Sequence, residues 1–220
     1  MIVAQLISNV IPSLQLTDTV QKALERMAEF KIYHLPVVEK HQFLGLVSEE
    51  ELIEQKEKDL SLGSSSLSFL NAFTLEDAHF YDVLRLFNQF HLSLVPILDR
   101  NKSYIGVVSI PGLLAYIAEI YVVNEPGGII VLSVNNRNNS LAHMSQIVEA
   151  DNAQILSSHV QAFPNSTKLE ITLKINKAEI SGIIAAFERY NYEVKAVFNN
   201  LQPDNGTADR FDSFMNYLNV

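Results

Sequence analysis

Two short stretches, "GLVSEEEL" at residues 45–52 and "GVVSIPGL" at residues 106–113, repeat one pattern of a glycine, two apolar residues and a serine. The stretches match up to the serine and then part, and at the third position after it Glu51 stands in the first and Gly112 in the second. In each, an apolar run typical of a strand leads into a segment with helical spacing, and the serine is placed to cap that helix. The pattern therefore predicts a duplicated unit whose copies share a strand-to-helix junction and differ in whether an acid follows the serine by three residues.

The duplication extends upstream, because a shift of 60 residues superimposes a second set of apolar positions. Each set has the spacing of one buried helix face: Val20, Ala23, Leu24, Met27 and Phe30, then Phe80, Val83, Leu84, Phe87 and Phe90. The strands "KIYHLPVVEK" and "HLSLVPILDR" follow, with Pro36 aligned on Pro96. We expect final helices at residues 49–57 and 111–119, the second with Pro111 at its first position.

Each predicted unit is thus helix–strand–strand–helix in about 50 residues, which is too few to bury its apolar faces alone. We therefore expect the two repeats, at about residues 1–60 and 61–122, to pack against each other in pseudo-twofold fashion. The segment "LSLGSSSLS" at residues 60–68 is interpreted as a flexible connector between them.

After "NEPGG" at residues 124–128 the pattern changes to strand–helix–strand–strand–helix–strand. The run "IIVLSV" is typical of a central strand, and "KLEITLKIN" alternates apolar and polar residues. Asn176 and Glu179 form an expected cap pair for the second helix. The order βαββαβ predicts a ferredoxin-like domain at residues 127–199. Residues 200–220 are predicted to be a linker and an amphipathic helix bearing Phe211, Phe214, Met215 and Leu218.

Composition excludes several classes of function. The chain has 220 residues and no cysteine, so disulfides, zinc–thiolate sites and thiol catalysis are excluded. Its net charge of −9 disfavours a nucleic-acid partner. There is no basic segment before an apolar core and no apolar run of about 18 residues, so we expect a cytoplasmic protein without a membrane partner. The six histidines lack metal-ligand spacing, and no catalytic constellation is legible. We therefore expect no enzyme, no cofactor and no metal.

The duplicated unit resembles the CBS domain, on "HLPVV" and "LVPIL" and on the serine phrase that opens each final helix. The resemblance covers residues 1–122. Residues 127–199 resemble an ACT domain, on topology and on the opening "PGGIIVLSV". The fold class implied is α+β, two CBS repeats followed by an ACT-like ferredoxin-like domain. The resemblance implies a regulatory, ligand-sensing protein, because CBS pairs often hold AMP, ADP, ATP or S-adenosylmethionine in clefts between their repeats.

The resemblance also implies ligand-binding residues. In the family's motif the hydroxyl residue contacts phosphate and the acid three residues later holds the ribose, which matches Ser48 and Glu51. The second repeat matches at Ser109, but Gly112 cannot hold a ribose, so no more than one cleft is expected to bind. The base pocket would be lined by backbone at Tyr33, His34, Leu35 and Pro36, and at residues 94–96. Alternatively, Ser48 and Ser109 serve only as helix caps and Glu51 is a solvated glutamate.

Two alternative functions remain open. The protein is either a structural interaction module without a nucleotide, or an amino-acid sensor through its ACT-like part. The loop "NNRNNS" at residues 135–140 lacks the glycine that amino-acid-binding ACT domains usually carry. Both modules commonly self-associate, so we expect a homodimer, and the regulated protein target is not encoded in any motif.

Overall fold

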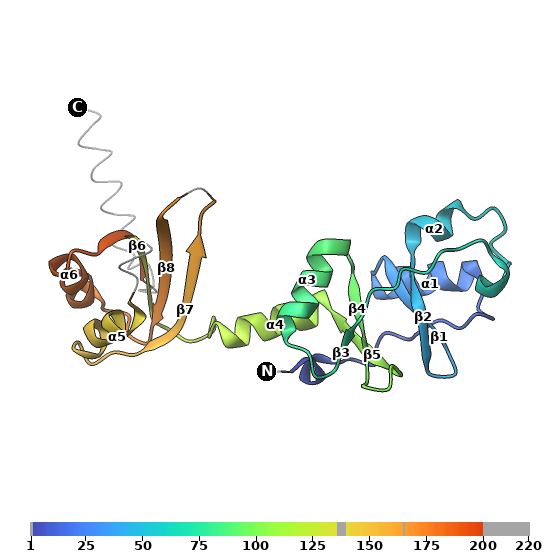
Figure 1. The fold of residues 1–220 in the computed structure, drawn as a ribbon, viewed down its shortest axis with the longest axis horizontal. Helices are drawn as coiled ribbons and strands as arrows, with labels where there is room; N and C mark the ends of the chain where they lie inside the picture. Colours follow the sequence, from blue (N-terminus) through green and yellow to red (C-terminus); the bar gives the residue numbers. More distant parts are fainter. Residues whose placement is uncertain (1, 136–139, 165, 200–220) are drawn as a thin grey trace, which may run out of the picture. The chain divides into compact units, whose positions relative to one another are not determined.

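The structure is a computed structural model that describes residues 2–135, 140–164 and 166–199. The chain divides into two compact units, residues 1–117 and 118–220 (Figure 1). The tail helix expected in residues 200–220 lies outside the described residues.

The N-terminal unit contains the duplication. The first repeat consists of η1 (Val3–Leu6), α1 (Val20–Phe30), β1 (His34–Glu39), β2 (Gln42–Ser48) and α2 (Glu49–Glu54). The second consists of η2 (Leu62–Ser64), β3 (Thr74–Leu75), α3 (Phe80–Phe90), β4 (Leu94–Leu98), β5 (Tyr104–Ser109) and α4 (Ile110–Ile120). The α1 and α3 helices begin and end 60 residues apart, so the predicted repeat is confirmed. Helix α2 ends at Glu54 rather than at residue 57, and Pro111 is the second residue of α4 rather than the first.

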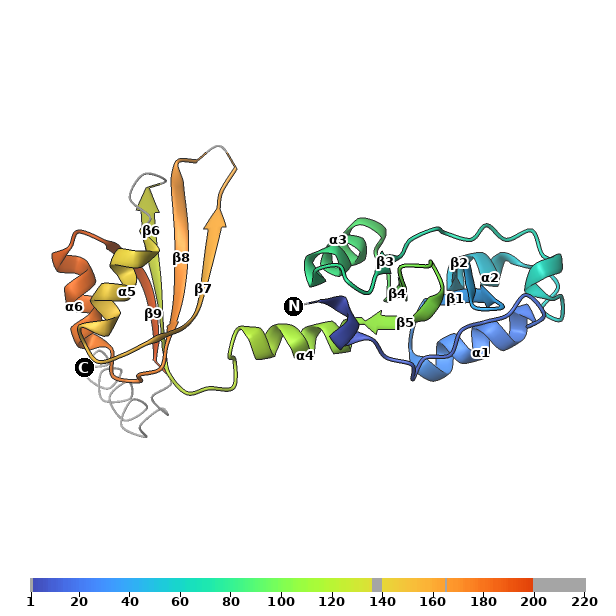
Figure 2. The same cartoon turned by 60° about the horizontal axis from the view of Figure 1, so that its bottom comes forward.

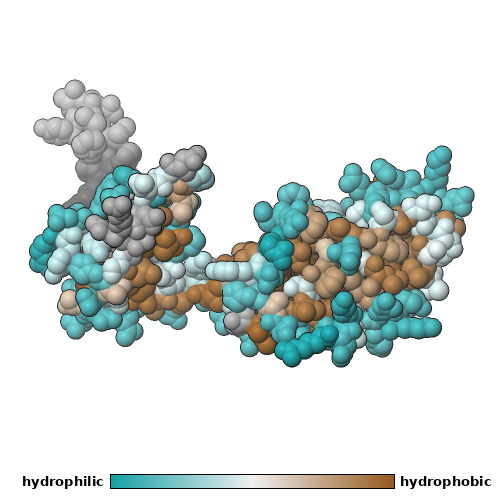
Figure 3. Space-filling view, viewed as in Figure 1, coloured by the Kyte–Doolittle hydropathy of each residue, from teal (hydrophilic) through white to brown (hydrophobic). Residues whose placement is uncertain are grey.

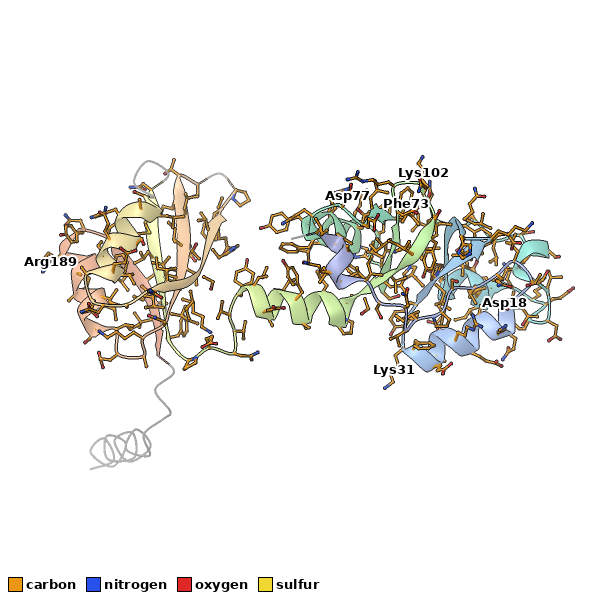
Figure 4. All side chains as sticks on the ribbon, turned by 90° about the horizontal axis from the view of Figure 1, so that it is seen from below. Asp18, Lys31, Phe73, Asp77, Lys102 and Arg189 are labelled. Atoms are coloured by element: carbon orange, nitrogen blue, oxygen red, sulfur yellow. The ribbon has the colours of Figure 1, made fainter. Side chains whose placement is uncertain are left out.

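Backbone details repeat as well. Lys31 and His91 end α1 and α3 in the left-handed conformation, with φ of 54° and 51°. The antiparallel hairpins β1–β2 and β4–β5 each carry an irregularity, between Val37 and Val38 and between Ile97 and Leu98. Lys31 points away from the unit, as Figure 4 shows. The two repeats therefore share turns and caps as well as apolar spacing.

The start of α1 is held by a buried carboxylate. Asp18, 9% exposed, accepts hydrogen bonds from Lys22 Nζ at 2.6 Å and from the Gln15 backbone N–H at 2.9 Å (Figure 4). Thr19 caps the helix by accepting from the Lys22 backbone N–H at 3.1 Å. A buried charge is tolerated when it is paired and hydrogen-bonded, and these contacts supply both.

The connector between the repeats is anchored at Leu62 and Gly63, which the prediction of a flexible segment at residues 60–68 did not include. Leu62 is 1% exposed, and its N–H donates to the Asp18 carbonyl at 2.8 Å. The next N–H, of Gly63, donates to the Leu16 carbonyl at 2.9 Å. The serines favour a flexible segment, but the apolar side chain of Leu62 is buried between them and anchors the segment.

Each repeat begins with an extended segment that pairs with the hairpin of the other repeat. Leu70, which precedes α3, exchanges two backbone hydrogen bonds of 2.9 and 2.8 Å with Leu46 of β2. Ser8, which precedes α1, exchanges two of 2.8 and 3.1 Å with Val107 of β5. The exchange is reciprocal, so each repeat completes the hydrogen bonding of its partner's hairpin.

The C-terminal unit is a four-stranded antiparallel sheet in the order β7-β8-β6-β9. Its elements are β6 (Gly128–Asn135), α5 (Leu141–Glu149), β7 (Ile155–Ala162), β8 (Lys168–Ile175), α6 (Ser181–Arg189) and β9 (Glu193–Asn199). Figure 2 shows α5 and α6 on one face of this sheet. The core between them is apolar and includes Ile130, Leu132, Met144, Leu173 and Phe187. The predicted ferredoxin-like topology is confirmed.

The predicted cap pair of α6 is wrong in one member. The helix begins at Ser181, whose N–H donates to Glu179 Oε1 at 3.0 Å. Asn176 lies too far upstream to cap it, and its Oδ1 accepts instead from the Gln154 N–H at 2.8 Å.

The reciprocal pairing requires glycine at the crossing points. Gly45 has φ of +145°, and a Cβ there would lie 2.6 Å from Phe69 Cβ and 2.9 Å from the Phe69 carbonyl carbon. We predict that Gly45→Ala lowers the free energy of unfolding by about 3 kcal/mol, from backbone strain and overpacking. Urea denaturation followed by circular dichroism measures the change.

The matched control is Gly112→Ala. A Cβ on Gly112 would meet only the Ser109 Oγ, at 3.3 Å, and the residue lies in the first turn of α4. Alanine is a better helix former, so stability should stay the same or rise by up to about 1 kcal/mol. Equal stability of Gly45→Ala and the native chain would contradict the close crossing.

Candidate functional site

A cavity of about 470 Å³ lies in the first repeat. Its lining comes from β1, β2, α2 and the segment that crosses from the second repeat: His34, Leu46, Ser48, Glu51, Ser68, Phe69, Leu70 and Asn71. Three residues implied by the resemblance, His34, Ser48 and Glu51, are thus brought together. Their convergence follows from the local fold, because β2 runs directly into α2 beside the first residue of β1.

Ser48 caps α2 and holds the Glu51 side chain. Its Oγ accepts from the Glu51 N–H at 3.3 Å and donates to Glu51 Oε2 at 3.1 Å. The other carboxylate oxygen, Oε1, accepts from Ser68 Oγ at 2.8 Å. The carboxylate therefore already accepts two hydroxyl groups, one on each oxygen. A carboxylate has about four acceptor positions, so each oxygen retains capacity for a further donor.

His34 connects this cavity to the second repeat. Ser93 Oγ accepts hydrogen bonds from the backbone N–H groups of Tyr33 and His34, both at 3.0 Å. The Ser93 N–H lies 3.3 Å from His34 Nδ1, which places an acceptor nitrogen there and the ring proton on Nε2 when the ring is neutral. Burial of the imidazole lowers the pKa of His34, and the Glu51 carboxylate opposes this shift.

The other residues implied by the resemblance do not line this cavity. The Tyr33 side chain is 63% exposed, and its carbonyl accepts from the Glu49 N–H at 2.9 Å. Leu35 is fully buried and Pro36 is also buried, so their side chains belong to the core. The expectation that their backbone lines a base pocket stays a prediction.

Ser109 occupies the equivalent position in the second repeat. Its Oγ accepts from the Gly112 N–H at 3.3 Å, so it caps α4 as Ser48 caps α2. No carboxylate follows it at the third position, because Gly112 stands there. Both serines are thus helix caps, and only Ser48 also holds an acid.

Sequence reasoning missed the wall formed by Ser68, Phe69, Leu70 and Asn71. Ser68 ends the segment that was interpreted as flexible and the other three residues follow it, and the pairing of Leu70 with Leu46 brings them onto β2. One signal was available. The apolar pair Phe69–Leu70 is costly to leave in water, which argues against a solvated linker.

The charge of the cavity is acidic. The described residues that line it include Glu51 and neither lysine nor arginine. Glu49 and Glu50 precede Glu51 in the first turn of α2. The site therefore suits neutral or cationic groups better than a chain of phosphates.

A second cavity of about 700 Å³ lies at the end of β6 in the C-terminal unit. Ser133, Asn135, Ser140 and His143 line it on one side and Tyr192 on the other. His143 Nδ1 lies 2.8 Å from the Tyr192 hydroxyl. The described part of the chain contains no cluster of three metal-ligating side chains and no helix long and apolar enough to cross a membrane.

The lowered pKa of His34 predicts a pH dependence of stability. Between the folded-state pKa and the ordinary value of 6.5, the unfolded chain binds more protons than the folded chain. The free energy of unfolding should therefore fall as the pH drops from about 7.5 to about 5.5. Urea denaturation should show a smaller fall in His34→Asn, whose Oδ1 keeps an acceptor for Ser93. The exposed His159→Asn serves as control, and an unaltered pH dependence in His34→Asn would contradict the assignment.

A family model matches both repeats of the N-terminal unit. The CBS domain model matches residues 3–58 and 73–119. A CBS domain pair/ACT domain protein from Thermotoga maritima is 24% identical over 54% of this chain and 98% of its own, with a TM-score of 0.49. The CBS-pair protein CBSX2 from Arabidopsis thaliana is 18% identical over 54% and 95%, with a TM-score of 0.46. CBSX2 in complex with AMP is 18% identical over 54% and 97%, also with a TM-score of 0.46. Residues 3–58 and 73–119 of the chain belong to the CBS domain family and form a tandem pair.

Proposed function

We propose that the protein is a ligand-sensing regulator whose CBS pair binds one adenosine-type ligand, in the cavity of the first repeat. The observation that carries the proposal is the convergence of His34, Ser48 and Glu51 on one cavity, with the carboxylate already accepting two hydroxyl groups. Regulation would follow from different ligand affinities of two arrangements of the modules, which shifts their populations. No catalytic step is proposed.

The arrangement of Glu51 suits a ribose. Two vicinal ribose hydroxyls present two donors, and the carboxylate oxygens retain acceptor capacity beyond Ser48 and Ser68. The two serines orient the carboxylate from opposite sides. A glutamate can therefore take the role that the family usually gives to aspartate, because its longer side chain is fixed by Ser68 of the crossing segment.

The charge of the cavity predicts the order of affinity among the four adenosine-type ligands. A triphosphate would place about four negative charges beside Glu51 without a lysine or arginine in the lining. S-adenosylmethionine carries a sulfonium cation and AMP a single phosphate. We therefore infer that S-adenosylmethionine and AMP bind more tightly than ADP or ATP.

The first test is calorimetry with these four ligands. We predict no more than one ligand per chain, and at least about tenfold weaker binding in Glu51→Ala, since hydrogen bonds to charged groups are worth about 1.5–3 kcal/mol. Glu51→Gln keeps the shape and should lose most of the same affinity.

The control for this test is Gly112→Ala, which changes the equivalent position of the second repeat and should leave affinity unchanged. Two equal sites per chain, or full affinity in Glu51→Ala, would contradict the site. Binding of none of the four ligands would favour an interaction module without a nucleotide.

A second candidate function is amino-acid sensing by the ACT-like unit. The cavity at the end of β6 favours it, because Ser133, Asn135 and Ser140 offer hydrogen-bonding groups beside the paired ring of His143. The same calorimetry with free amino acids tests it. A heat of amino-acid binding that persists in Glu51→Ala and disappears in His143→Phe would assign the amino-acid site to this unit.

We also propose that the protein is a homodimer. The edge strands β7 and β9 leave Val160 and Phe198 exposed at 44% and 57%, and unpaired edges favour association. In the CBS pair, Ile110 and Leu114 of α4 are 50% and 63% exposed. Figure 3 shows further apolar surface gathered between α3 and α2 on one face of this unit. Self-complementary surfaces of this kind commonly form twofold dimers.

Light scattering tests the dimer. We predict a mass of twice the 24.7 kDa of the chain, and a mass of one chain for Leu114→Asp, because a charge on this helix would have to be buried. Glu119→Asp, a conservative change near the end of the same helix, is the control. A native mass near 24.7 kDa would rule the dimer out.

A further inference from the structure

A third cavity lies on the face of the C-terminal sheet opposite α5 and α6. Its volume is about 510 Å³. Its floor is formed by β6, β7 and β8, and its rim by the segment that enters β6: Tyr121, Val123, Gly127, Ile129, Ser157, His159, Thr172 and Lys174. Ligand sites of small molecules commonly occupy 300–1,000 Å³ and are mostly apolar with a few placed polar groups. This cavity has that character.

Lys174 is the unusual member of the lining. Lys174 is only 8% exposed, although it projects from the outer face of the sheet. Thr172, the neighbouring outward residue of β8, carries no charge. Its ammonium donates to the carbonyls of Val122 at 2.5 Å and of Val123 at 3.0 Å. No carboxylate of the described residues forms an ion pair with it. An ammonium has three donors, so one is left for an acceptor inside or beside the cavity.

The backbone that meets Lys174 is held in an uncommon conformation. Val122 has φ of +52°, and left-handed geometry at a β-branched residue is an outlier. This conformation ends α4, with the Val122 N–H bonded to the Glu119 carbonyl at 2.9 Å and the Val123 N–H to the Ala118 carbonyl at 3.0 Å. It presents two consecutive carbonyls to one ammonium. Strained residues persist where surrounding contacts require them, and such places are often functional.

The remaining walls define the kind of ligand. Tyr121, Val123 and Ile129 supply apolar surface, and the Tyr121 ring packs edge-on against His159 with centroids 6.3 Å apart. Ser157 Oγ donates to the Tyr121 carbonyl at 3.1 Å and fixes the rim. Among the described residues that line the cavity there is no aspartate or glutamate, and Lys174 is the charged side chain that distinguishes it.

We propose that this cavity binds a small carboxylate with an apolar body. The carboxylate would accept the free donor of Lys174 Nζ, and the apolar body would lie between Tyr121, Val123 and Ile129. Because the rim and the floor both contact it, the ligand would stabilise the attachment of residues 121–127 to the sheet. The site is separate from the adenosine-type cavity and from the cavity beside His143, and it does not depend on either.

Calorimetry and methyl NMR on the full-length chain test the site with phenylacetate as probe and phenylacetamide as its uncharged match. We expect phenylacetate to bind with a Kd of about 1 mM or tighter, as small ligands do, and the amide about tenfold more weakly. Phenylacetate should shift the methyl signals of Val123 and Ile129.

Two variants locate the binding. Val123→Asp puts a carboxylate at the 57% exposed rim, beside Lys174, and should weaken phenylacetate about tenfold by competition and repulsion. Leu141→Asp adds the same charge at a 42% exposed position at the start of α5 and should leave affinity within about twofold. Lys174→Met should abolish binding while circular dichroism reports the fold.

Three results would overturn the proposal. The first is equal binding of phenylacetate and phenylacetamide, and the second is full affinity for phenylacetate in Val123→Asp. The third is no saturable binding of phenylacetate or 3-methylbutanoate up to about 10 mM, a concentration well above the Kd expected for such ligands.

Discussion

The N-terminal unit depends on two close backbone crossings, at Gly45 and Gly106. A Cβ on Gly106 would lie 2.6 Å from Asn9 Oδ1 and from Ile7 Cγ2, and a Cβ on Gly45 would meet Phe69 equally closely. Both glycines have positive φ, at +151° and +145°. Side chains at these points would push away the segment that completes each hairpin. The two repeats are therefore one folding unit, since neither hairpin is fully paired without the other repeat.

The same crossing creates the cavity of the first repeat. The segment that passes Gly45 carries Ser68 onto the Glu51 carboxylate, and it supplies half of the lining. The site thus includes residues from both repeats, although its recognisable motif belongs to the first. A ligand there would contact the crossing segment as well as α2. Binding and the association of the repeats are then coupled through the same contacts.

The sequence predicted the fold well because the fold rests on periodic apolar spacing, which is local. That spacing predicted the helices α1 and α3, both hairpins and the βαββαβ order. Of the residues that line the candidate site, the sequence predicted His34, Ser48 and Glu51, which lie in the two contiguous motifs of the first repeat. Ser68 and Ser93 were missed because their partners lie 17 residues or 59–60 residues away, across a crossing that spacing does not encode. The serines around Leu62 also predicted a flexible connector, whereas the buried Leu62 side chain anchors the segment.

Two charged residues, Glu51 and Lys174, line cavities and depart from common local patterns. Gly112 shows that a cap serine can open a CBS helix without an acid three residues later, so Glu51 is not required by α2. Lys174 departs in another way, because its ammonium is buried with two backbone carbonyls and forms no ion pair among the described residues. Local choices that depart from what the backbone needs tend to mark function. In this protein both departures line cavities, one acidic and one basic, and opposite charge at the two sites would let one chain respond to two chemically different ligands.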